Sequence, residues 1–480
     1  MKKFIYSLLV GVTILAVSCS DFTDVQPKGK NLLSTTDELE MLLNQPFTLR
    51  DNDLCTLCGD FIYALSDVPT ILSQPNKTRQ SILFAWDEAN IDKFAELTNS
   101  DGLYTTAYGI IGKIANPVLY RVNDAVGSDK AKKQLKGEAL VLRAYYHYLL
   151  INKFAKAYNP TTANNDPGLP YVTEDWDIIV PTEKVSIKEF YDNIINDLDL
   201  AIELDALPAQ AVNRMRMNKA SAYAVKALAL MDMQKFDEAA VAARAALDIN
   251  GVVNNYNEML GTHKGLILGN EYPIIVRPNL KCEEDIFFTQ GLEFYRSITP
   301  AAWDRFEPGH ASKEKMLIDR MFYDYTQGMG TMITGLDYTM TYDLASGWNM
   351  SGVKTTQMYL IIAESEIRKN NFNNGMKALD AIRKNRIDPS LYEPLEGKVN
   401  NMADAIMNLK RTAHGENIYT LHSFINYKRW NLFPDYKETF SRVIAGKAYQ
   451  ITPESKMWVF PLPMNAISLN PNLLPQNYSL

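Results

Sequence analysis

The sequence predicts a mainly α-helical fold, a scaffold of helical repeats with long loop-rich insertions. Two stretches far apart in the chain, residues 218–248 and 356–386, carry the same pattern of two amphipathic helices joined by a short turn. In both stretches apolar residues recur at spacings of three and four, which places one apolar stripe on each helix. Such a stripe is stable only when it is buried, so each pair is expected to pack against a neighbour.

The first pair reads NKASAYAVKALALMDM, then QKF, then DEAAVAARAALD. Ala220, Ala224 and Ala227 fall on the inward face of its first helix, and alanines also make the inward stripe of the second. These small side chains let the two backbones approach closely. A helix pair that is rich in alanine, with one aromatic residue at the turn, resembles a tetratricopeptide repeat.

The second pair repeats this layout, and Phe372 holds the place that Phe236 holds in the first pair. Two more stretches, Lys136 to Phe154 and Ile187 to Leu204, have the same periodicity. We therefore expect repeat units near residues 137–155, 187–248 and 356–386. Because their intervals are unequal, the sequence predicts an interrupted scaffold and not a regular solenoid.

Residues 1–18 have the pattern of a secretory signal peptide. Two lysines precede an apolar run from Phe4 to Val17, which is shorter than the roughly 20 residues that a membrane-spanning helix needs. The run ends in LAVSC, which resembles a bacterial lipobox, the motif whose cysteine receives lipid. Cys19 is therefore the predicted lipidation site, and its acyl chains would hold the protein on a membrane surface. The alternative is an ordinary signal peptide with a chance cysteine.

The polar residues 19–30, which include one proline, are typical of a tether, so the folded domain is expected to span residues 31–480. The chain has 49 basic and 56 acidic residues, and removal of residues 1–18 takes two lysines away, which leaves a net charge near −9. An acidic surface without a basic stripe repels phosphate backbones, so no nucleic-acid partner is expected.

The motifs of common catalytic sites are missing. We find no GxSxG, HExxH or GxxxxGK motif and no complete GxGxxG, and no two of the five histidines stand four residues apart. Cys55 and Cys58 form a lone CxxC, which lacks the four ligands of a zinc site and is either a small disulfide loop or two thiols. The prediction is a protein without enzymatic activity, cofactor or metal.

Two acidic clusters, at residues 174–177 and 283–285, could supply the carboxylate pair of a glycosidase. We interpret them as solvated surface, as charge clusters usually are. His147 is interpreted as a core or boundary residue, and Asp51 and Asp53 as part of a loop, because they do not complete the spacing of a calcium-binding loop.

A family resemblance emerges from short motifs that follow one another in order. They are a tryptophan at position 86, YxxxY from Tyr104, IAN from Ile114, GEAxxxRAYY from Gly137, YLxxAES from Tyr359 and WVFPLP from Trp458. Behind a lipobox, this order resembles the SusD/RagB family of outer-membrane nutrient-uptake lipoproteins.

The resemblance implies a lipid-anchored protein on the outer membrane, facing outside, that covers a SusC-like TonB-dependent transporter. Its function would be to capture an oligosaccharide and deliver it to that transporter. Two alternatives stay open: a peptide-binding member of the same family, and a repeat scaffold that binds only protein partners. A surface glycoside hydrolase is a weaker rival, because no sharp catalytic motif supports it.

The ligand face is expected in the loop-rich insertion, about residues 251–354, which lacks long helical periodicity and is rich in aromatic residues. Loops on a rigid scaffold commonly carry binding function, and flat rings suit the apolar faces of sugars. Members of the family also place ligand aromatics near the N-terminal tryptophan. The predicted ligand-binding residues are Trp86, Tyr295, Trp303, Tyr323 and Trp348.

Overall fold

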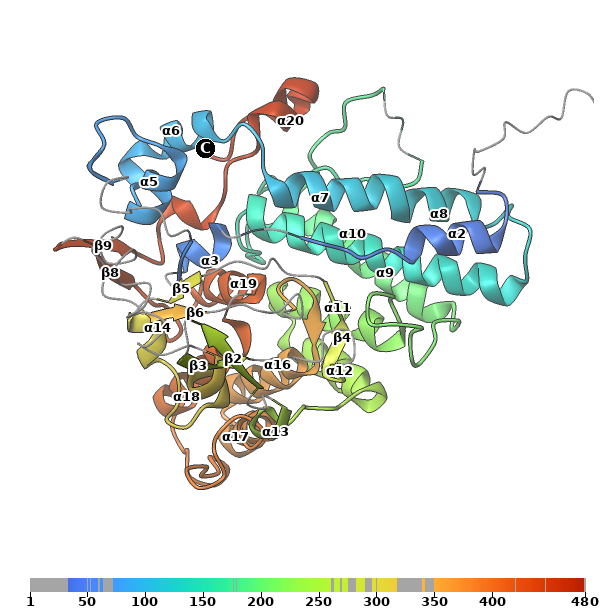
Figure 1. Ribbon diagram of the computed structural model, residues 1–480. Coiled ribbons are helices and arrows are strands. Elements are labelled where there is room, and N and C mark those ends of the chain that lie inside the picture. Colours follow the sequence, from blue (N-terminus) through green and yellow to red (C-terminus); the bar gives the residue numbers. More distant parts are fainter. Residues whose placement is uncertain are drawn as a thin grey trace, which may run out of the picture.

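The computed structural model describes residues 33–49, 51, 53–58, 61–63, 72–175, 177, 179–259, 263–267, 270–274, 282–289, 296–298, 300–316, 339–341, 349–418, 420–444 and 446–478. The chain is mostly helical, which confirms the predicted fold class (Figure 1). Within the described ranges, no helix is long and apolar enough to cross a membrane.

The α-helices are α2 Thr36–Leu43, α3 Asp53–Leu57, α5 Arg79–Ala85, α6 Ile91–Leu97, α7 Gly102–Ile110, α8 Asn116–Arg121, α9 Asp129–Phe154, α10 Ile187–Glu203, α11 Lys219–Asp232, α12 Phe236–Ile249, α13 Tyr256–Met259, α14 Pro300–Asp304, α16 Thr355–Arg368, α17 Phe372–Arg383, α18 Met402–Asn417, α19 Leu421–Trp430 and α20 Met464–Leu469. The described residues also contain two π-helical segments, η2 Ile111–Ala115 and η4 Ser312–Met316, and three 3-10 turns, η1 Glu88–Asn90, η5 Lys456–Trp458 and η6 Pro471–Leu473.

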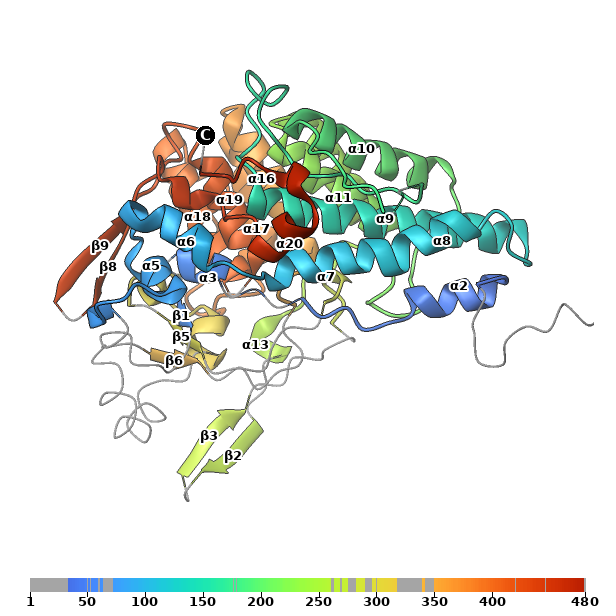
Figure 2. The same cartoon turned by 90° about the horizontal axis from the view of Figure 1, so that it is seen from above.

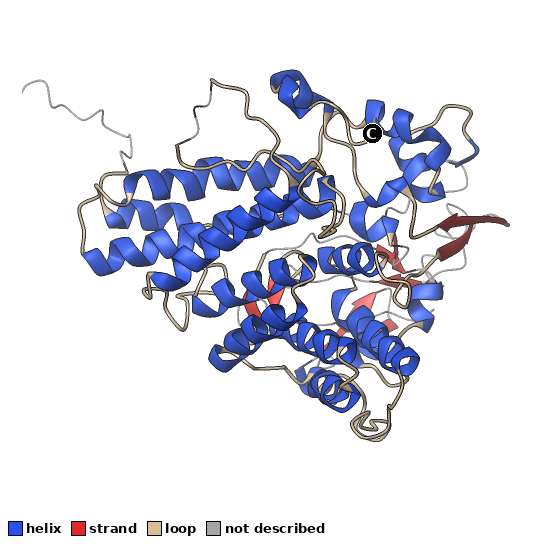
Figure 3. Cartoon of the chain, turned by 180° about the vertical axis from the view of Figure 1, so that it is seen from behind, coloured by secondary structure: helices blue, strands red, loops and turns tan. Residues whose placement is uncertain are grey.

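The long helices form a stack in which each packs against the next, in the order α9, α10, α11, α12, α16, α17 and α18 (Figures 1 and 3). The helices α9, α11, α16 and α18 also contact one another in turn. Although residues 250–354 run between them in the chain, α12 and α16 pack directly together. The insertion therefore leaves the stack and returns to it without separating neighbouring pairs.

The two predicted helix pairs are confirmed as α11–α12 and α16–α17, and they share one turn geometry. The middle turn residue is left-handed in each, Gln234 at φ 63° and Asn370 at φ 61°. The next amide, of Lys235 in one pair and Asn371 in the other, donates to the carbonyl five residues earlier. This is the hydrogen bond of a Schellman motif, which satisfies a carbonyl that the ending helix leaves unpaired.

The helix of Tyr104 and Tyr108 continues past Asn116-Pro117. It passes through the π-helical segment η2 and continues as α8, with Pro117 in the first turn of α8. A proline removes one backbone donor and crowds the carbonyl four residues earlier. A π turn is a recognised way to absorb such a break within a helix.

The strands are short and lie outside the stack. They are β1 Phe61–Tyr63, β2 His263–Ile267, β3 Asn270–Ile274, β4 Asp285–Phe287, β5 Arg296–Ile298, β6 Thr339–Thr341, β7 Val353–Lys354, β8 Phe440–Ile444 and β9 Lys447–Ile451. They pair antiparallel as β1-β5-β6, β2-β3, β4-β7 and β8-β9, and the β2-β3 and β8-β9 hairpins extend away from the helices (Figure 2). The β4-β7 pair opposes Asp285 to Lys354, so it holds the insertion to the first residues of α16.

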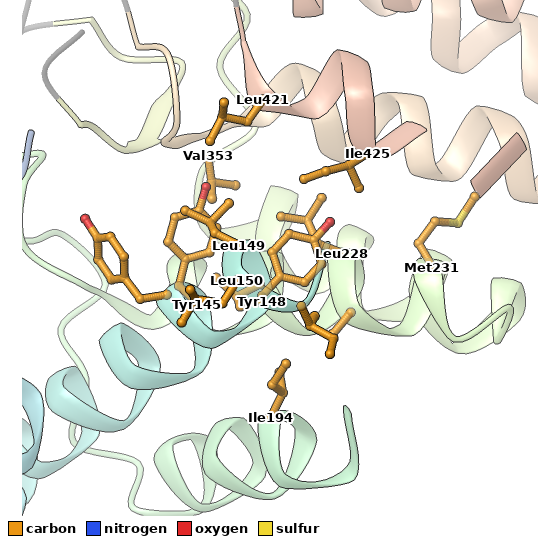
Figure 4. Packing of buried hydrophobic residues seen from close by; sticks show 14 of the residues in the cluster. Tyr145, Tyr148, Leu149, Leu150, Ile194, Leu228, Met231, Val353, Leu421 and Ile425 are labelled. Carbon is orange, nitrogen blue, oxygen red and sulfur yellow. The ribbon is translucent and has the colours of Figure 1, made fainter. Parts of the chain in front are cut away.

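The core is centred on α9, whose residues from Gly137 to Phe154 are buried on every face. Tyr145 and Tyr148 stack with ring centroids 6.2 Å apart, and Leu228 and Ile425 surround them (Figure 4). His147 is fully buried in the same helix, which confirms its interpretation as a core residue.

Candidate functional site

The structure describes two of the five aromatic residues expected at the ligand face, Trp86 and Trp303. Tyr295, Tyr323 and Trp348 lie outside the described residues, as does the expected lipidation site Cys19. The site is therefore built from Trp86, Trp303 and the side chains that hold them.

Trp86 is the left-handed residue that ends α5, with φ 47°. Its indole N–H donates a hydrogen bond to the carbonyl of Leu57 at 2.9 Å, and only 5% of the residue is exposed. The guanidinium of Arg442, on β8, lies 3.6 Å from the ring centroid, in the position of a cation–π contact. Trp86 thus packs between α3, α5 and β8, with Arg442 over its ring.

Trp303 lies in the short helix α14 and is half-buried. The ammonium of Lys313, on η4, lies 4.9 Å from its ring centroid. Asp304 and Glu314 beside these two residues are exposed. Of the two described aromatics, Trp303 is the one that a ligand can reach without displacing buried structure, and it has a cation close to its ring.

Arg305 holds the end of α14 in place. It pairs with Glu438 at 3.0 Å, donates to the hydroxyl of Tyr427 at 3.2 Å and lies 4.8 Å from the ring centroid of Phe440. Phe440 is the first residue of β8, the strand whose Arg442 covers Trp86. The strand β8 therefore links the surroundings of Trp86 and Trp303, which are far apart in the sequence.

Two buried histidines, His414 and His310, pack against α14 and the residues that follow it. Nε2 of His414 lies 2.8 Å from the carbonyl oxygen of Ala302, and the ring of Phe306 packs edge-on against His414 and His310. Burial lowers the pKa of His414 to about 3 and that of His310 to about 4, so both rings are neutral at neutral pH. Neutral His414 must then donate its Nε2–H to Ala302, which fixes α14 against α18.

Gly415 makes this close packing possible. A Cβ at position 415 would lie 2.6 Å from Nε2 of His310, a distance that no ordinary side chain tolerates. The helix α18 can approach His310 only because the residue at this position is glycine.

A fully buried ion cluster joins the insertion to the stack. Arg386 pairs with Glu284 at 2.9 Å and with Glu416 at 2.6 Å, and its guanidinium lies 3.6 Å from the ring centroid of Tyr256. Although burial alone would raise it, the pKa of Glu416 is held down at about 2 by Arg386 and Lys354. Such a cluster is costly to break, because either partner left alone is an uncompensated buried charge.

The interpretation of the acidic clusters as solvated surface is wrong for three carboxylates. Glu284 and Asp285 are fully buried, and Glu174 forms an ion pair with Arg143. The reason is that these carboxylates meet cations and hydrogen-bond donors supplied by distant parts of the chain.

The interpretation of Asp51 and Asp53 as part of a loop is confirmed for Asp51, which lies outside any helix or strand, and is wrong for Asp53. Asp53 begins α3 and pairs with Arg79 at 2.5 Å, while Asp51 pairs with Lys153 of α9. Burial raises the pKa of the Asp51 carboxyl to about 6, but only 2% of its side chain is exposed. A raised pKa alone does not make an acid catalyst, because a substrate must also reach the group.

The side chains that sequence reasoning missed are the cations over the rings, Lys313 and Arg442. Neither stands at a helical or strand spacing from its tryptophan, because Lys313 is ten residues from Trp303 and Arg442 is on a different element from Trp86. No local sequence signal could have paired them.

Comparison with known proteins gives a match to one family model over part of the chain. Residues 22–229 match a SusD-like family model described as starch-binding and associating with the outer membrane. A sequence search among curated proteins finds no match.

Solved structures resemble the chain over nearly its whole length. A putative sugar binding protein from Bacteroides vulgatus is 16% identical, with a TM-score of 0.63, and the match covers 94% of this chain and 99% of that one. SusD superfamily proteins from Bacteroides thetaiotaomicron and Bacteroides fragilis are 16% and 14% identical, with TM-scores of 0.62 and 0.65, and both matches cover 92% of this chain and 99% of the other. At such identities the likeness shows a common fold.

Proposed function

We propose that the chain is a member of the SusD/RagB family, which the match of residues 22–229 and the fold support, and that it captures an oligosaccharide at the cell surface and delivers it to a SusC-like TonB-dependent transporter. The observation that carries the proposal is the family match, whose description combines starch binding with association with the outer membrane. The protein would bind and hand over its ligand without changing it.

The surroundings of Trp303 fit this role. Sugars combine apolar C–H faces with hydroxyl groups, so they are bound by an aromatic ring with donors and acceptors at its edge. Trp303 supplies a half-buried ring, Lys313 supplies a donor, and Asp304 supplies an acceptor. The ring is held by α14, which Arg305 and His414 fix to the helical body.

The membrane attachment in this proposal rests on the lipobox-like end of the apolar run at Cys19. Lipid at Cys19, followed by the polar residues 19–30, would let the folded body lie beside the transporter while staying on the membrane. One face of the stack of α9 to α18 would provide the extended surface that docks on the transporter.

Calorimetric titration tests the ligand. The full chain, purified in detergent, is titrated with plant, host and microbial oligosaccharides and with mixed peptides. We expect binding to one saccharide class, and Trp303→Ala should weaken it about tenfold, which corresponds to about 1.4 kcal/mol. Tyr120→Ala, at an aromatic residue on α8 that is 58% exposed, is the matched control and should change nothing.

Two results would contradict the proposal. Binding of peptides in place of saccharides would assign the protein to peptide uptake. Silence across the whole panel, from a chain that still co-purifies with the transporter, would leave a scaffold that binds only proteins.

A further inference from the structure

A groove of about 900 Å³ lies on the helical stack, lined by α12, α16, α17 and the loop after α17. Its lining residues are Arg244, Leu247, Asp248, Tyr359, Ile362, Glu366, Asn374, Lys377, Ala378, Asp380, Ala381, Lys384, Tyr392, Pro394 and Glu396. None of them belongs to the insertion that carries Trp303, so the groove is separate from the site described above. Its volume is typical of pockets that enclose a small-molecule ligand.

Part of the charge in this groove is already neutralised. Glu366 pairs with Arg244 at 2.8 Å and accepts a hydrogen bond from Asn371. Asp380 pairs with Arg383 at 2.5 Å and accepts the backbone N–H groups of the loop at 395 and 396. Arg383, which lies behind the lining, also pairs with Glu307 at 2.7 Å, so this one arginine serves two carboxylates and the cluster keeps a net charge of −1.

Four exposed charged side chains remain in the groove. Two lysines lie on one wall, and two carboxylates lie on α12 and in the loop. Lys377 on α17 and Lys384, the residue that caps the C-terminal end of α17 with helical backbone angles, stand seven residues apart, so they lie on one face about 10 Å apart. Asp248 on α12 and Glu396 in the loop are exposed carboxylates. Within the described part of the chain, no ion pair is found for any of these four side chains.

Two tyrosines supply flat apolar surface between the charged walls. Tyr359 is half-buried in α16, and its hydroxyl donates to the carbonyl of Gly251 at 3.1 Å, which fixes the ring. Tyr392 is half-buried in the loop, with the guanidinium of Arg383 5.5 Å from its ring centroid. The apolar side chains Leu247 and Ile362 lie beside them in the lining.

This arrangement selects for a neutral ligand that both donates and accepts hydrogen bonds. An anionic ligand would face Asp248 and Glu396, and a cationic one would face the two lysines. An extended peptide finds no strand edge here, because the backbone groups within helices are already paired, so the groove offers a peptide side-chain contacts only. A hydroxyl group can donate to a carboxylate and accept from an ammonium, so a hydroxyl-rich ligand satisfies both walls.

We propose that the groove between α12 and α17 is a second binding site, and that its ligand is a neutral oligosaccharide. The inference rests on the proposed function, because it assumes that the chain meets glycans at the cell surface. Sugar rings would lie against Tyr359 and Tyr392, with their hydroxyls between Lys377 and Lys384 on one wall and Asp248 on the other.

Protection of lysine amines from acetylation tests the groove in the unmodified full chain. The protein is treated briefly with an acetylating reagent, alone and with a neutral hexose oligosaccharide that calorimetry shows to bind, at ten times its Kd. At that concentration about one site in eleven is empty, so acetylation of Lys377 and Lys384 should fall by up to about tenfold. Lys130, exposed in the first turn of α9, is the matched control and should react at the same rate with and without the sugar.

Two variants separate this site from the one at Trp303. Tyr392→Ala should abolish the protection of Lys377 while leaving the Trp303-dependent binding intact. Trp303→Ala should leave the protection of Lys377 in place. Both variants change residues that are only half-buried, so circular dichroism should show that they fold as the parent does.

Each contrary result is distinct. If a sugar binds by calorimetry but Lys377 and Lys384 react as before, the groove is not its site, and the proposed function stands. If only a uronate oligosaccharide or a peptide of lysine and glutamate protects the two lysines, the neutral-sugar assignment is overturned. If no oligosaccharide binds at all, calorimetry reports the failure of the proposed function itself.

Discussion

The helix pairs α11–α12 and α16–α17 align with each other without a gap, at a constant offset of 136 positions. Tyr223 corresponds to Tyr359, Phe236 to Phe372, and both turns have three residues with the middle one left-handed. The two pairs differ in a residue of their buried interior. Leu228 is buried in the first pair among apolar residues, and its counterpart in the second pair is Glu364.

Glu364 is stable in the interior because of what surrounds it. Its carboxylate pairs with Arg429 at 2.5 Å and Arg368 at 2.7 Å and accepts the indole N–H of Trp430 at 2.8 Å. The guanidinium of Arg368 in turn lies 4.0 to 4.2 Å from the ring centroids of Phe236, Phe433 and Tyr436. The turn and the small residues therefore set the geometry of a pair, while its interior takes a charge wherever the partners are supplied.

The largest expected effect is from removing that charge. Glu364→Ala removes the carboxylate that pairs with buried Arg429 and partly buried Arg368 and should lower the free energy of unfolding by about 4 kcal/mol. Leu228→Ala at the matched position removes apolar contacts and opens a cavity, for about 3 kcal/mol. Urea unfolding followed by circular dichroism measures both. A cost below about 1 kcal/mol for Glu364→Ala would show that the ion cluster is not what holds the second pair.

The second prediction concerns how the free energy of unfolding depends on pH. It compares Asp232 of α11 with Glu364 of α16, because both carboxylates face Arg429. Nε of Arg429 lies 3.2 Å from Asp232, farther than its contact with Glu364. Burial raises the pKa of Asp232 to about 6, whereas Arg429 and Arg368 outweigh burial and hold the pKa of Glu364 below its usual range.

The two pKa shifts change the free energy of unfolding in opposite directions as pH rises. Between about pH 4 and pH 6 the unfolded chain has lost the Asp232 proton and the folded chain keeps it, so stability falls as pH rises, by about 3 kcal/mol. The contribution of Glu364 is present above its ordinary pKa and is lost as pH falls below it.

Unfolding free energies from pH 3.5 to pH 7 separate the two carboxylates. Relative to Asp232→Asn, the parent should lose stability as pH rises from 4 to 6. Relative to Glu364→Gln, the parent should gain stability as pH rises through 4.5. If the two stability differences change with pH in the same direction, the result would contradict the distances, which place Arg429 closer to Glu364 than to Asp232.

Local patterns in the sequence were enough to predict the helix pairs. The alanine stripe acts within a few residues, and so does Asn218, which caps α11 by accepting the N–H of Ser221 at 2.8 Å. Thr35 caps α2 in the same way, by accepting the N–H of Glu38. Contacts of this kind can be read from a sequence because their partners are three or four residues apart.

The candidate site was harder to predict because its contacts are distant. Arg386 meets a carboxylate at position 284, and the arginine over Trp86 comes from position 442. Nothing in the sequence indicates which of 56 carboxylates is buried against which of 49 cations. Charge clusters therefore looked like solvated surface until the fold placed partners beside them.

The smallest expected effect tests the turn that both pairs share. A left-handed residue other than glycine costs about 1 kcal/mol, and asparagine bears this conformation better than most. Gln234 nonetheless occupies it in the first pair, and its side-chain amide donates to the carbonyl of Tyr158 at 3.0 Å. We infer that this hydrogen bond, worth about 1 kcal/mol, offsets the strain at Gln234.

Substitution by alanine and by glycine at both turns separates the cost of the left-handed backbone from the contribution of the side-chain hydrogen bond. The alanine variants keep the left-handed strain and the glycine variants relieve it, so Gly should exceed Ala by about 1 kcal/mol at position 234 and at position 370 alike. The loss from the parent to Ala should be larger for Gln234→Ala than for Asn370→Ala, because only the former removes the bond to Tyr158. Thermal unfolding of the four variants measures these differences. Equal losses in the two alanine variants would mean that the amide of Gln234 contributes nothing, and the turn would then be held by its backbone alone.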